Sequence, residues 1–193
     1  MTATWMTDRR GVTRSPSLAF RALFAGLLSV GLLAPSRVAA EDLFLRLDGI
    51  KGESTDDQHA KEIVLLSYSQ SFSKPPGGAP NPTNCGAIVV TKLIDRSSPA
   101  LIGAVLTGTA IPTGQITFRK SGQTPLEYFK VMMTEVVIES INQSDSSSDP
   151  TTVFEQVSIK AAKFTIEYTP QNNDGSLRGV VRFGWDCAAN RSL

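Results

Sequence analysis

The only histidine of the chain, His59, is the first candidate for chemistry because three carboxylates lie close to it in the sequence. Asp56 and Asp57 precede it, and Glu62 follows it. An imidazole beside carboxylates can act as a general acid or base, or can bind a metal ion. However, no second imidazole is available, and no G-x-S-x-G nucleophile motif accompanies it. We therefore expect His59 to belong to a structural loop before a strand, and we assign no catalytic residue, metal or cofactor.

The run Gly49-Ile50-Lys51-Gly52 is too short for a phosphate-binding loop and lacks the Gly-Lys-Ser/Thr ending, so a turn explains it better. Charge argues against nucleic-acid binding as well. Of the 19 Lys and Arg and the 18 Asp and Glu, five Arg and one Asp lie in residues 1–40. Residues 41–193 therefore carry 14 basic and 17 acidic side chains, a net charge of −3, and they contain no basic cluster.

The first forty residues have the organisation of a secretory signal peptide. An arginine-rich start is followed by an apolar run over residues 22–35 and then by Val38-Ala39-Ala40. Small residues at this spacing predict cleavage between Ala40 and Glu41, and hence a periplasmic or secreted protein. The apolar run is shorter than the roughly 20 residues of a spanning helix, so we expect no stable membrane anchor. The alternative is a true start near residue 41 and a cytoplasmic protein.

Cys85 and Cys187 are the only two cysteines. If the protein is exported, an oxidising compartment tends to pair two such thiols, which predicts a disulfide. The alternative is that Cys187 lies inward with Phe183 and Trp185 as a buried thiol, while Cys85 stays free in its loop. The sequence leaves both arrangements open.

Apolar and polar residues alternate along most of residues 41–193, which predicts half-buried β-strands. Residues 87–94 are apolar on both faces, so this strand is expected at the centre of a sheet. In residues 63–72 one parity is apolar and the other is rich in serine. The residues predicted to face the core in this segment are Val64, Leu66, Tyr68 and Phe72.

The apolar parity changes within residues 153–168. Val157, Ile159 and Ala161 share one parity, whereas Phe164, Ile166 and Tyr168 share the other. Since side chains alternate with a period of two, one strand cannot direct both sets inward without an extra residue. The pattern predicts a bulge or sharp bend near Ala162-Lys163, where the strand crosses between two sheets or turns a barrel corner.

Only residues 95–108 have the pattern of a helix. Ser98 is expected to cap it, Pro99 to occupy its first position, and Gly108 to end it. Its buried face would hold Leu101, Ala104 and Val105. About seven strands and one helix predict a single domain over residues 41–193, a mainly β fold built as a two-sheet β-barrel with a short lateral helix.

Several short runs resemble, in the same order, the haemolysin-coregulated proteins (Hcp), the tube subunits of type VI secretion systems. No single run is specific, but together they span residues 42–187. The runs are Asp48–Ser54, His59–Ile63, Thr91–Asp95 leading into Ser98–Leu101, Ile116–Lys120, Tyr168–Gln171 and Gly184-Trp185.

This resemblance implies a two-sheet β-barrel with a lateral helix and no enzymatic activity. It also implies hexameric rings that stack into a tube, with the type VI spike and sheath as partners of a cytoplasmic subunit. Hcp-like subunits are also released, and they can carry small effectors in the lumen of the ring.

Two functions follow from the sequence. The first is a structural subunit that assembles into rings, either in a tube or as a secreted component. The second is an exported monomeric β-barrel that binds a ligand or surface partner and has no role in injection. Ring closure needs two different patches that fit each other. The predicted patch elements are the loop of Lys51, Gly52, Glu53 and Ser54 and the loop of residues 75–82.

Overall fold

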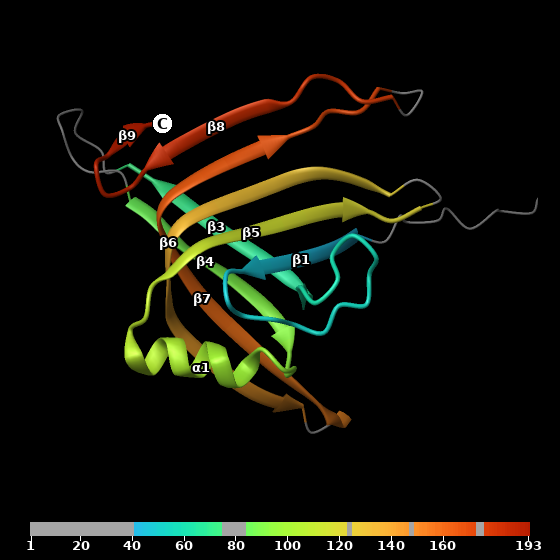
Figure 1. Ribbon diagram of the computed structural model, residues 1–193, viewed down its shortest axis with the longest axis vertical. Coiled ribbons are helices and arrows are strands. Elements are labelled where there is room, and N and C mark those ends of the chain that lie inside the picture. The colour runs from blue at the N-terminus through green and yellow to red at the C-terminus, as the bar shows by residue number, and fades with distance from the viewer. Residues whose placement is uncertain (1–40, 75–83, 123–124, 147–148, 173–175) are drawn as a thin grey trace, which may run out of the picture. The chain divides into compact units, whose positions relative to one another are not determined.

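Nine strands and one helix are defined within the residues that the computed structural model describes, which are 41–74, 84–122, 125–146, 149–172 and 176–193 (Figure 1). The predicted signal peptide, including Ala40, and the loop of residues 75–82 lie outside these ranges. The strands are β1 (Glu41–Leu47), β2 (Ile63–Leu65), β3 (Ser67–Ser73), β4 (Asn84–Leu93), β5 (Ile111–Lys120), β6 (Leu126–Ser146), β7 (Asp149–Tyr168), β8 (Val181–Asp186) and β9 (Arg191–Ser192), and the helix α1 is Ser98–Thr107.

The strands form one antiparallel sheet with the order β2-β1-β5-β6-β7-β4-β3, and β8 pairs with β7 and β9. The two ends of this order, β2 and β3, are consecutive in the chain and are joined at Leu66. Its N–H donates to the carbonyl oxygen of Thr91 in β4 at 2.7 Å. The sheet therefore curls round so that its two edge strands, β2 and β3, lie next to each other where the chain joins them. No β-ladder between these two strands closes the sheet. The mainly β fold with one short helix, predicted from the sequence, is confirmed.

The predicted parity change in β7 is present, although Tyr168 of the second set is exposed. Ile159 and Phe164 are both buried although they lie five positions apart and so have opposite parity. β7 pairs with β4 up to Ile159 and with β8 from Lys163 onward. The facing strand β6 accommodates the same bend at Glu135, which has a φ of 54°. The predicted extra residue near Ala162-Lys163 is absent, because the ladder between β6 and β7 keeps one register through Thr134↔Lys163 and Val136↔Ala161, and the nearest register shift lies between Ile138 and Ser140 of β6. The parity change instead marks the position where β7 exchanges one neighbour for another.

The inward face predicted for residues 63–72 is wrong for Val64, Leu66 and Phe72, and of the four predicted residues Tyr68 alone is partly buried, while Phe72 is 46% exposed. Ile63 and Leu65 are buried, whereas Val64 and Leu66 are about half exposed. The reason is a change of partner: the chain pairs with β1 through Leu65 and with β4 from Ser67. Because the single residue Leu66 separates the two strands, the parity of the inward-facing residues differs between β2 and β3. One alternating pattern therefore cannot describe both strands.

Helix α1, Ser98–Thr107, lies within the predicted residues 95–108, but its N-cap differs and Pro99 occupies its second position. Ser97 occupies the cap position, and Gly108 ends the helix in the left-handed conformation with φ 64°. Ser98, the predicted cap, has another role. Its hydroxyl accepts the N–H of Asp95 and donates to the carboxylate of Glu155. Within the described residues no helix is long and apolar enough to span a membrane.

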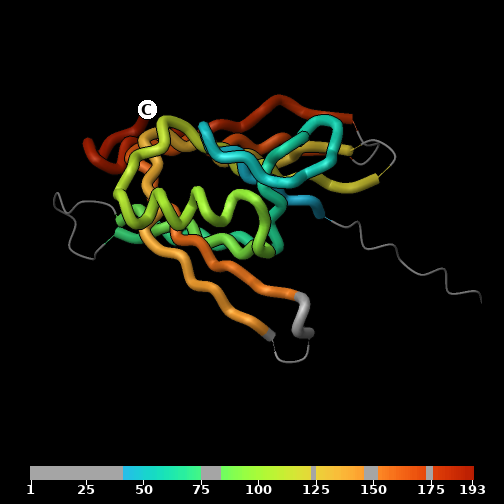
Figure 2. The backbone as a smooth tube through the Cα atoms, turned by 60° about the horizontal axis from the view of Figure 1, so that its bottom comes forward, coloured from blue at the N-terminus to red at the C-terminus, as the bar shows by residue number. Residues whose placement is uncertain are grey.

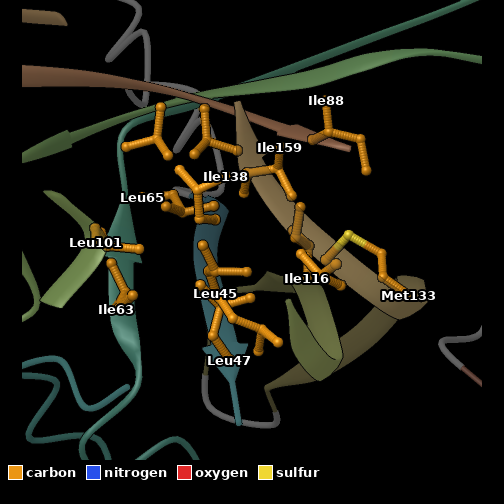
Figure 3. Close-up of a cluster of buried hydrophobic side chains, with 14 of the residues drawn as sticks. Leu45, Leu47, Ile63, Leu65, Ile88, Leu101, Ile116, Met133, Ile138 and Ile159 are labelled. Carbon is orange, nitrogen blue, oxygen red and sulfur yellow. The ribbon is translucent and has the colours of Figure 1, made fainter. Parts of the chain in front are cut away.

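An apolar core fills the inside of the curled sheet, as Figure 3 shows. Of the predicted helix face, Leu101 and Ala104 are buried and Val105 is partly buried. Figure 2 shows α1 lying beside the hairpin of β6 and β7, whose described ends extend beyond the helix. The fully or nearly fully buried strand residues labelled in the close-up are Leu45, Leu47, Ile63, Leu65, Ile88, Ile116, Met133, Ile138 and Ile159.

Candidate functional site

The predicted ring-interface residues lie on the loop between β1 and β2, residues 48–62. The loop folds back on itself: the N–H of Gly52 donates to the carbonyl oxygen of Lys61 at 2.8 Å, and that of Ser54 donates to Glu62 at 3.0 Å. A Cβ on Gly52 would lie 2.6 Å from the carbonyl carbon of Glu62. Backbone approach this close requires a glycine, so the loop has a defined conformation.

Only two of the four predicted interface residues have exposed side chains. Gly52 and Ser54 are buried, whereas Lys51 and Glu53 are exposed. Glu53 accepts the N–H of Arg96 at 3.1 Å, which links the loop to the turn before α1. Lys51 lies in the wall of a groove of about 560 Å³ that the loop shares with the end of β1. A partner would therefore meet a basic and an acidic side chain beside this groove.

Arg119 of β5 ties the loop to the sheet. Its two terminal nitrogens donate to the carboxylate of Asp56 at 2.9 and 2.6 Å, and Nη2 also donates to Asp42 at 3.0 Å. These charge-assisted bonds hold the pKa of Asp56 well below its usual range, because the hydrogen bond from Arg119 outweighs the effect of burial. The guanidinium also lies over the ring of Phe44, 4.9 Å from its centroid.

His59 is a buried support of the same loop, with 5% of its surface exposed. Its ring stacks on Phe44 with centroids 4.2 Å apart. Nδ1 lies 3.0 Å from Glu62, and Nε2 lies 3.2 Å from Glu127 of β6. Burial raises the pKa of Glu127, but Lys130 and His59 lower it, and the net shift is downward. The imidazole is thus enclosed by an aromatic ring and two carboxylates, which suits positioning of the loop.

Of the carboxylates predicted near His59, Glu62 contacts its ring and Asp56 accepts its backbone N–H at 3.1 Å. Asp57 is exposed. Across the described part of the chain, no group of three His, Cys, Asp or Glu side chains is placed to hold a metal ion. The cluster built around His59 and Arg119 holds residues 48–62 against β1, β5 and β6.

A second polar cluster, not singled out from the sequence, lies beneath the start of α1. Lys92 of β4 and Glu155 of β7 are both fully buried, with Nζ 2.7 Å from Oε2. Lys92 also lies 2.8 Å from Asp95, and Gln143 donates to the other oxygen of Glu155 at 2.7 Å. Burial raises the pKa of Glu155, but the hydrogen bonds from Lys92 and Ser98 lower it, and the net shift is downward.

The sequence does contain a signal for this cluster. Ile88, Val90 and Lys92 have the same parity in β4, and all three are buried. A lysine in register with two core residues of a central strand predicts a buried partner carboxylate. Sequence spacing gives no indication of which carboxylate it is, because Glu155 is 63 residues away.

Cys85 and Cys187 form a disulfide in the structure, with their Cα atoms 6.1 Å apart. Cys85 lies near the start of β4, and Cys187 directly follows β8. Oxidation of such a pair in the cell also needs an oxidising compartment, so the bridge and the predicted export are linked.

An apolar groove lies beside the disulfide. Val181, Phe183 and Trp185 share one face of β8, as the alternation predicts, but Val181 and Phe183 are more than half exposed. β8 lies at an edge of the sheet, where it pairs with β7 and the two-residue β9. The groove has a volume of about 370 Å³ and is lined by Phe72, Cys85, Phe164, Ile166, Phe183 and Trp185.

Comparison with known proteins identifies the family. The family model described as "Type VI secretion system effector, Hcp" matches residues 44–168, which include the loop of residues 48–62, α1 and both buried polar clusters. The chain belongs to the Hcp family. The resemblance found in the short runs of sequence is thereby confirmed, and the family is one of type VI secretion components.

Individual Hcp proteins match nearly their whole length. Protein hcp1 of Pseudomonas aeruginosa is 32% identical over 159 residues, which cover 78% of this chain and 98% of that protein. The crystal structure of Hcp1 from Salmonella typhimurium has a TM-score of 0.67 at 30% identity, covering 80% of this chain and 99% of that one. A structure described as a type six secretion system protein has a TM-score of 0.73 at 25% identity, with 80% and 100% coverage.

Proposed function

We propose that this Hcp-family chain is exported, is cleaved between Ala40 and Glu41, and assembles as residues 41–193 into closed rings of six. The observation that carries the proposal is the extent of the match: the chain covers 98% of hcp1 of Pseudomonas aeruginosa and 99% of the Salmonella Hcp1 structure. The domain therefore lacks no substantial part of either relative. The ring is its structural role, in a stacked tube or as a released component, and we assign it no catalytic residue.

The surface of the domain supports assembly through two unlike patches. One is the loop of residues 48–62, where Lys51 and Glu53 are exposed beside a groove. The other is the outer edge of β8, which β9 pairs with only at Trp185 and Asp186 and where Val181 and Phe183 are exposed. An open strand edge with apolar side chains is a surface that assembly can cover. Ring closure requires two such different patches on each subunit.

A second candidate function is supported by the aromatic groove. Its volume of about 370 Å³ and its almost wholly apolar lining fit a small apolar ligand. A monomeric exported barrel that binds such a ligand would need no ring. If the true start is near residue 41, the subunit would stay in the cytoplasm and meet the type VI spike, sheath and small effectors.

Two measurements test the proposed function. Mass spectrometry of the protein from a periplasmic extract should show a chain that begins at Glu41, and intact protein confined to the cytoplasm would contradict export. Light scattering on residues 41–193 should give six times the monomer mass. A monomer at the highest soluble concentration would contradict the ring and favour the ligand-binding barrel.

A further inference from the structure

β7 has two successive neighbours on one side, and the sheet forks where one replaces the other. Residues 154–159 of β7 pair with β4, whereas residues 163–168 pair with β8. Residues 160–162 lie between the two ladders, at the parity change of the strand. β3 and β4 form one prong of this fork, and β8 and β9 form the other.

The disulfide lies at the base of the fork. Cys85 precedes Ile88, the first residue of β4 paired with β7, by three positions. Cys187 directly follows Asp186, the last residue of β8 paired with β7, and its N–H donates to the carbonyl oxygen of Ala162 at 2.8 Å. In Figure 1 the end of β8 and the start of β4 accordingly lie side by side. Each cysteine is thus placed where its prong leaves β7.

Aromatic side chains also connect the prongs through the buried Phe164, but the outer two, Phe72 and Phe183, are about half exposed. Phe72 of β3 and Phe164 of β7 have ring centroids 5.0 Å apart, and Phe164 and Phe183 of β8 have centroids 6.4 Å apart. Phe72 is 46% exposed and Phe183 is 54% exposed. Since stabilisation by packing scales with the apolar area removed from water, these contacts hold the prongs less firmly than a covalent bond.

We propose that the Cys85–Cys187 disulfide is a redox-dependent staple that fixes the β8–β9 prong against the β3–β4 prong and sets the width of the aromatic groove between them. The groove has walls from both prongs, because Phe72 and Cys85 belong to one while Phe183 and Trp185 belong to the other. In the reduced protein β8 keeps its ladder with β7, but its end is no longer tied to β4. Cys187 lies beyond residues 44–168, so the family match does not include this bridge.

The staple forms by thiol–disulfide exchange with a disulfide-bearing oxidant, either a small disulfide or an oxidoreductase. The thiolate of one cysteine attacks the oxidant, which forms a mixed disulfide and releases one thiol. The thiolate of the other cysteine then displaces the second thiol. Two protein thiols thus give up two electrons and two protons, and one disulfide is reduced to two thiols. Such oxidants act outside the cytoplasm.

Export would therefore allow the disulfide to form and fix the β8–β9 edge of the sheet. The exposed Val181 and Phe183, a candidate subunit contact, lie on the prong that the staple holds. An assembly surface on β8 would be rigid only after the protein leaves the cytoplasm. This consequence for assembly rests on the proposed function. The proposal that the disulfide fixes the β8–β9 prong against the β3–β4 prong does not.

Hydrogen exchange measured by mass spectrometry tests the staple on protein produced from the full chain and exported. Three samples are compared: the oxidised protein, the same protein with reductant, and the double variant Cys85→Ser/Cys187→Ser. We expect amides of residues 181–187 and 84–87 to exchange at least tenfold faster after reduction and in the variant. Core amides of residues 43–47 and 131–138 should change less than twofold. The double variant is also the control for the reductant, which should not affect it.

Three results would overturn the proposal. The first is equal exchange of β8 in the oxidised and reduced samples. The second is a uniform increase across the whole core, because the bridge would then act only through global stability. The third is two free thiols in the exported protein. Size-exclusion chromatography of the same samples separates the two proposals. Monomers in every sample would contradict the ring. The role of the disulfide is decided by the exchange data alone.

Discussion

Lys92 and Glu155 form an ion pair in which neither side chain is exposed to solvent, with Nζ 2.7 Å from Oε2. Burying two charges costs desolvation free energy that only good geometry and further hydrogen bonds offset. Ser98 and Gln143 supply such bonds to the carboxylate. Asp95 brings a second acidic side chain to Lys92, at 2.8 Å. One cation therefore holds two carboxylates at the position where β4 turns into α1.

We predict that Lys92→Met lowers the free energy of unfolding more than Glu155→Gln does. Losing Lys92 leaves Glu155 buried without a counter-charge and Asp95 without its partner, at a cost of about 3 to 5 kcal/mol. Glu155→Gln leaves Lys92 paired with Asp95, so its cost should be smaller. Urea unfolding followed by circular dichroism measures both, and equal losses would contradict the assigned role of Lys92.

The double variant Lys92→Met/Glu155→Gln is the matched control for this pair. Because it removes both charges, it should be less destabilised than the sum of the two single changes. Strict additivity would show that the two side chains do not interact.

The pKa of Asp56 predicts how stability depends on pH. The hydrogen bond from Arg119 lowers this pKa well below the ordinary value of 3.8. A lowered folded-state pKa contributes stability that is present above the unfolded value and is lost as the pH falls through the folded value. Unfolding free energy should therefore decrease from about pH 5 downward. Asp56→Asn should be less stable than the natural protein at pH 7, and the gap should narrow toward pH 2.

Asp57→Asn is the control for this experiment, since Asp57 is the exposed neighbour of Asp56. Its unfolding curve should follow that of the natural protein across the same pH range. A constant gap between Asp56→Asn and the natural protein from pH 7 to pH 2 would show that the Arg119 contact does not depend on the charge of Asp56.

The strand pattern and the helix could be predicted because they depend on neighbours in the sequence. The alternation of Leu43, Leu45 and Leu47, and the ending of α1 at Gly108, are local signals. The inward face of residues 63–66 could not be predicted correctly, because it depends on which strand each residue pairs with. The exchange from β1 to β4 at Leu66 is a long-range event with no local signature.

The same distinction explains what sequence analysis found of the candidate site. The loop of Lys51, Gly52, Glu53 and Ser54 and the two cysteines were predicted from short motifs and composition. The supports of the loop were missed because they lie far away in the chain: Arg119 binds Asp56 across 63 residues and Asp42 across 77. Phe44 contacts both the guanidinium of Arg119 and the ring of His59, and no spacing rule indicates either contact.

Gly52→Ala is predicted to destabilise the loop. The added methyl group would lie 2.6 Å from both the carbonyl carbon of Glu62 and the Cα of Ile63, so the backbone must shift. We expect a loss of about 1 to 3 kcal/mol in unfolding free energy, in the range of other overpacked sites. Thermal unfolding measures it.

Gly103→Ala is the matched substitution on α1, where a Cβ would have no atom within 4 Å. Alanine has the higher helix propensity, so this variant should gain about 0.5 to 1 kcal/mol. A loss at Gly103 equal to that at Gly52 would contradict the close approach seen in the loop.

The last prediction concerns the exposed charges of the loop. Lys51 is exposed in the wall of the groove next to Glu53, so reversing its charge should disturb a neighbouring subunit without disturbing the fold. We expect Lys51→Glu to raise the dissociation constant of the ring at least tenfold, because like charges juxtaposed at an interface are unfavourable. Lys160→Glu is the control, since Lys160 is 57% exposed on β7 and far along the chain from the loop. Light scattering over a range of concentrations measures both variants, and raised salt should reduce the difference between them. If Lys51→Glu and the natural protein give the same mass at every concentration, the loop is not a ring contact, and the edge of β8 becomes the patch to test.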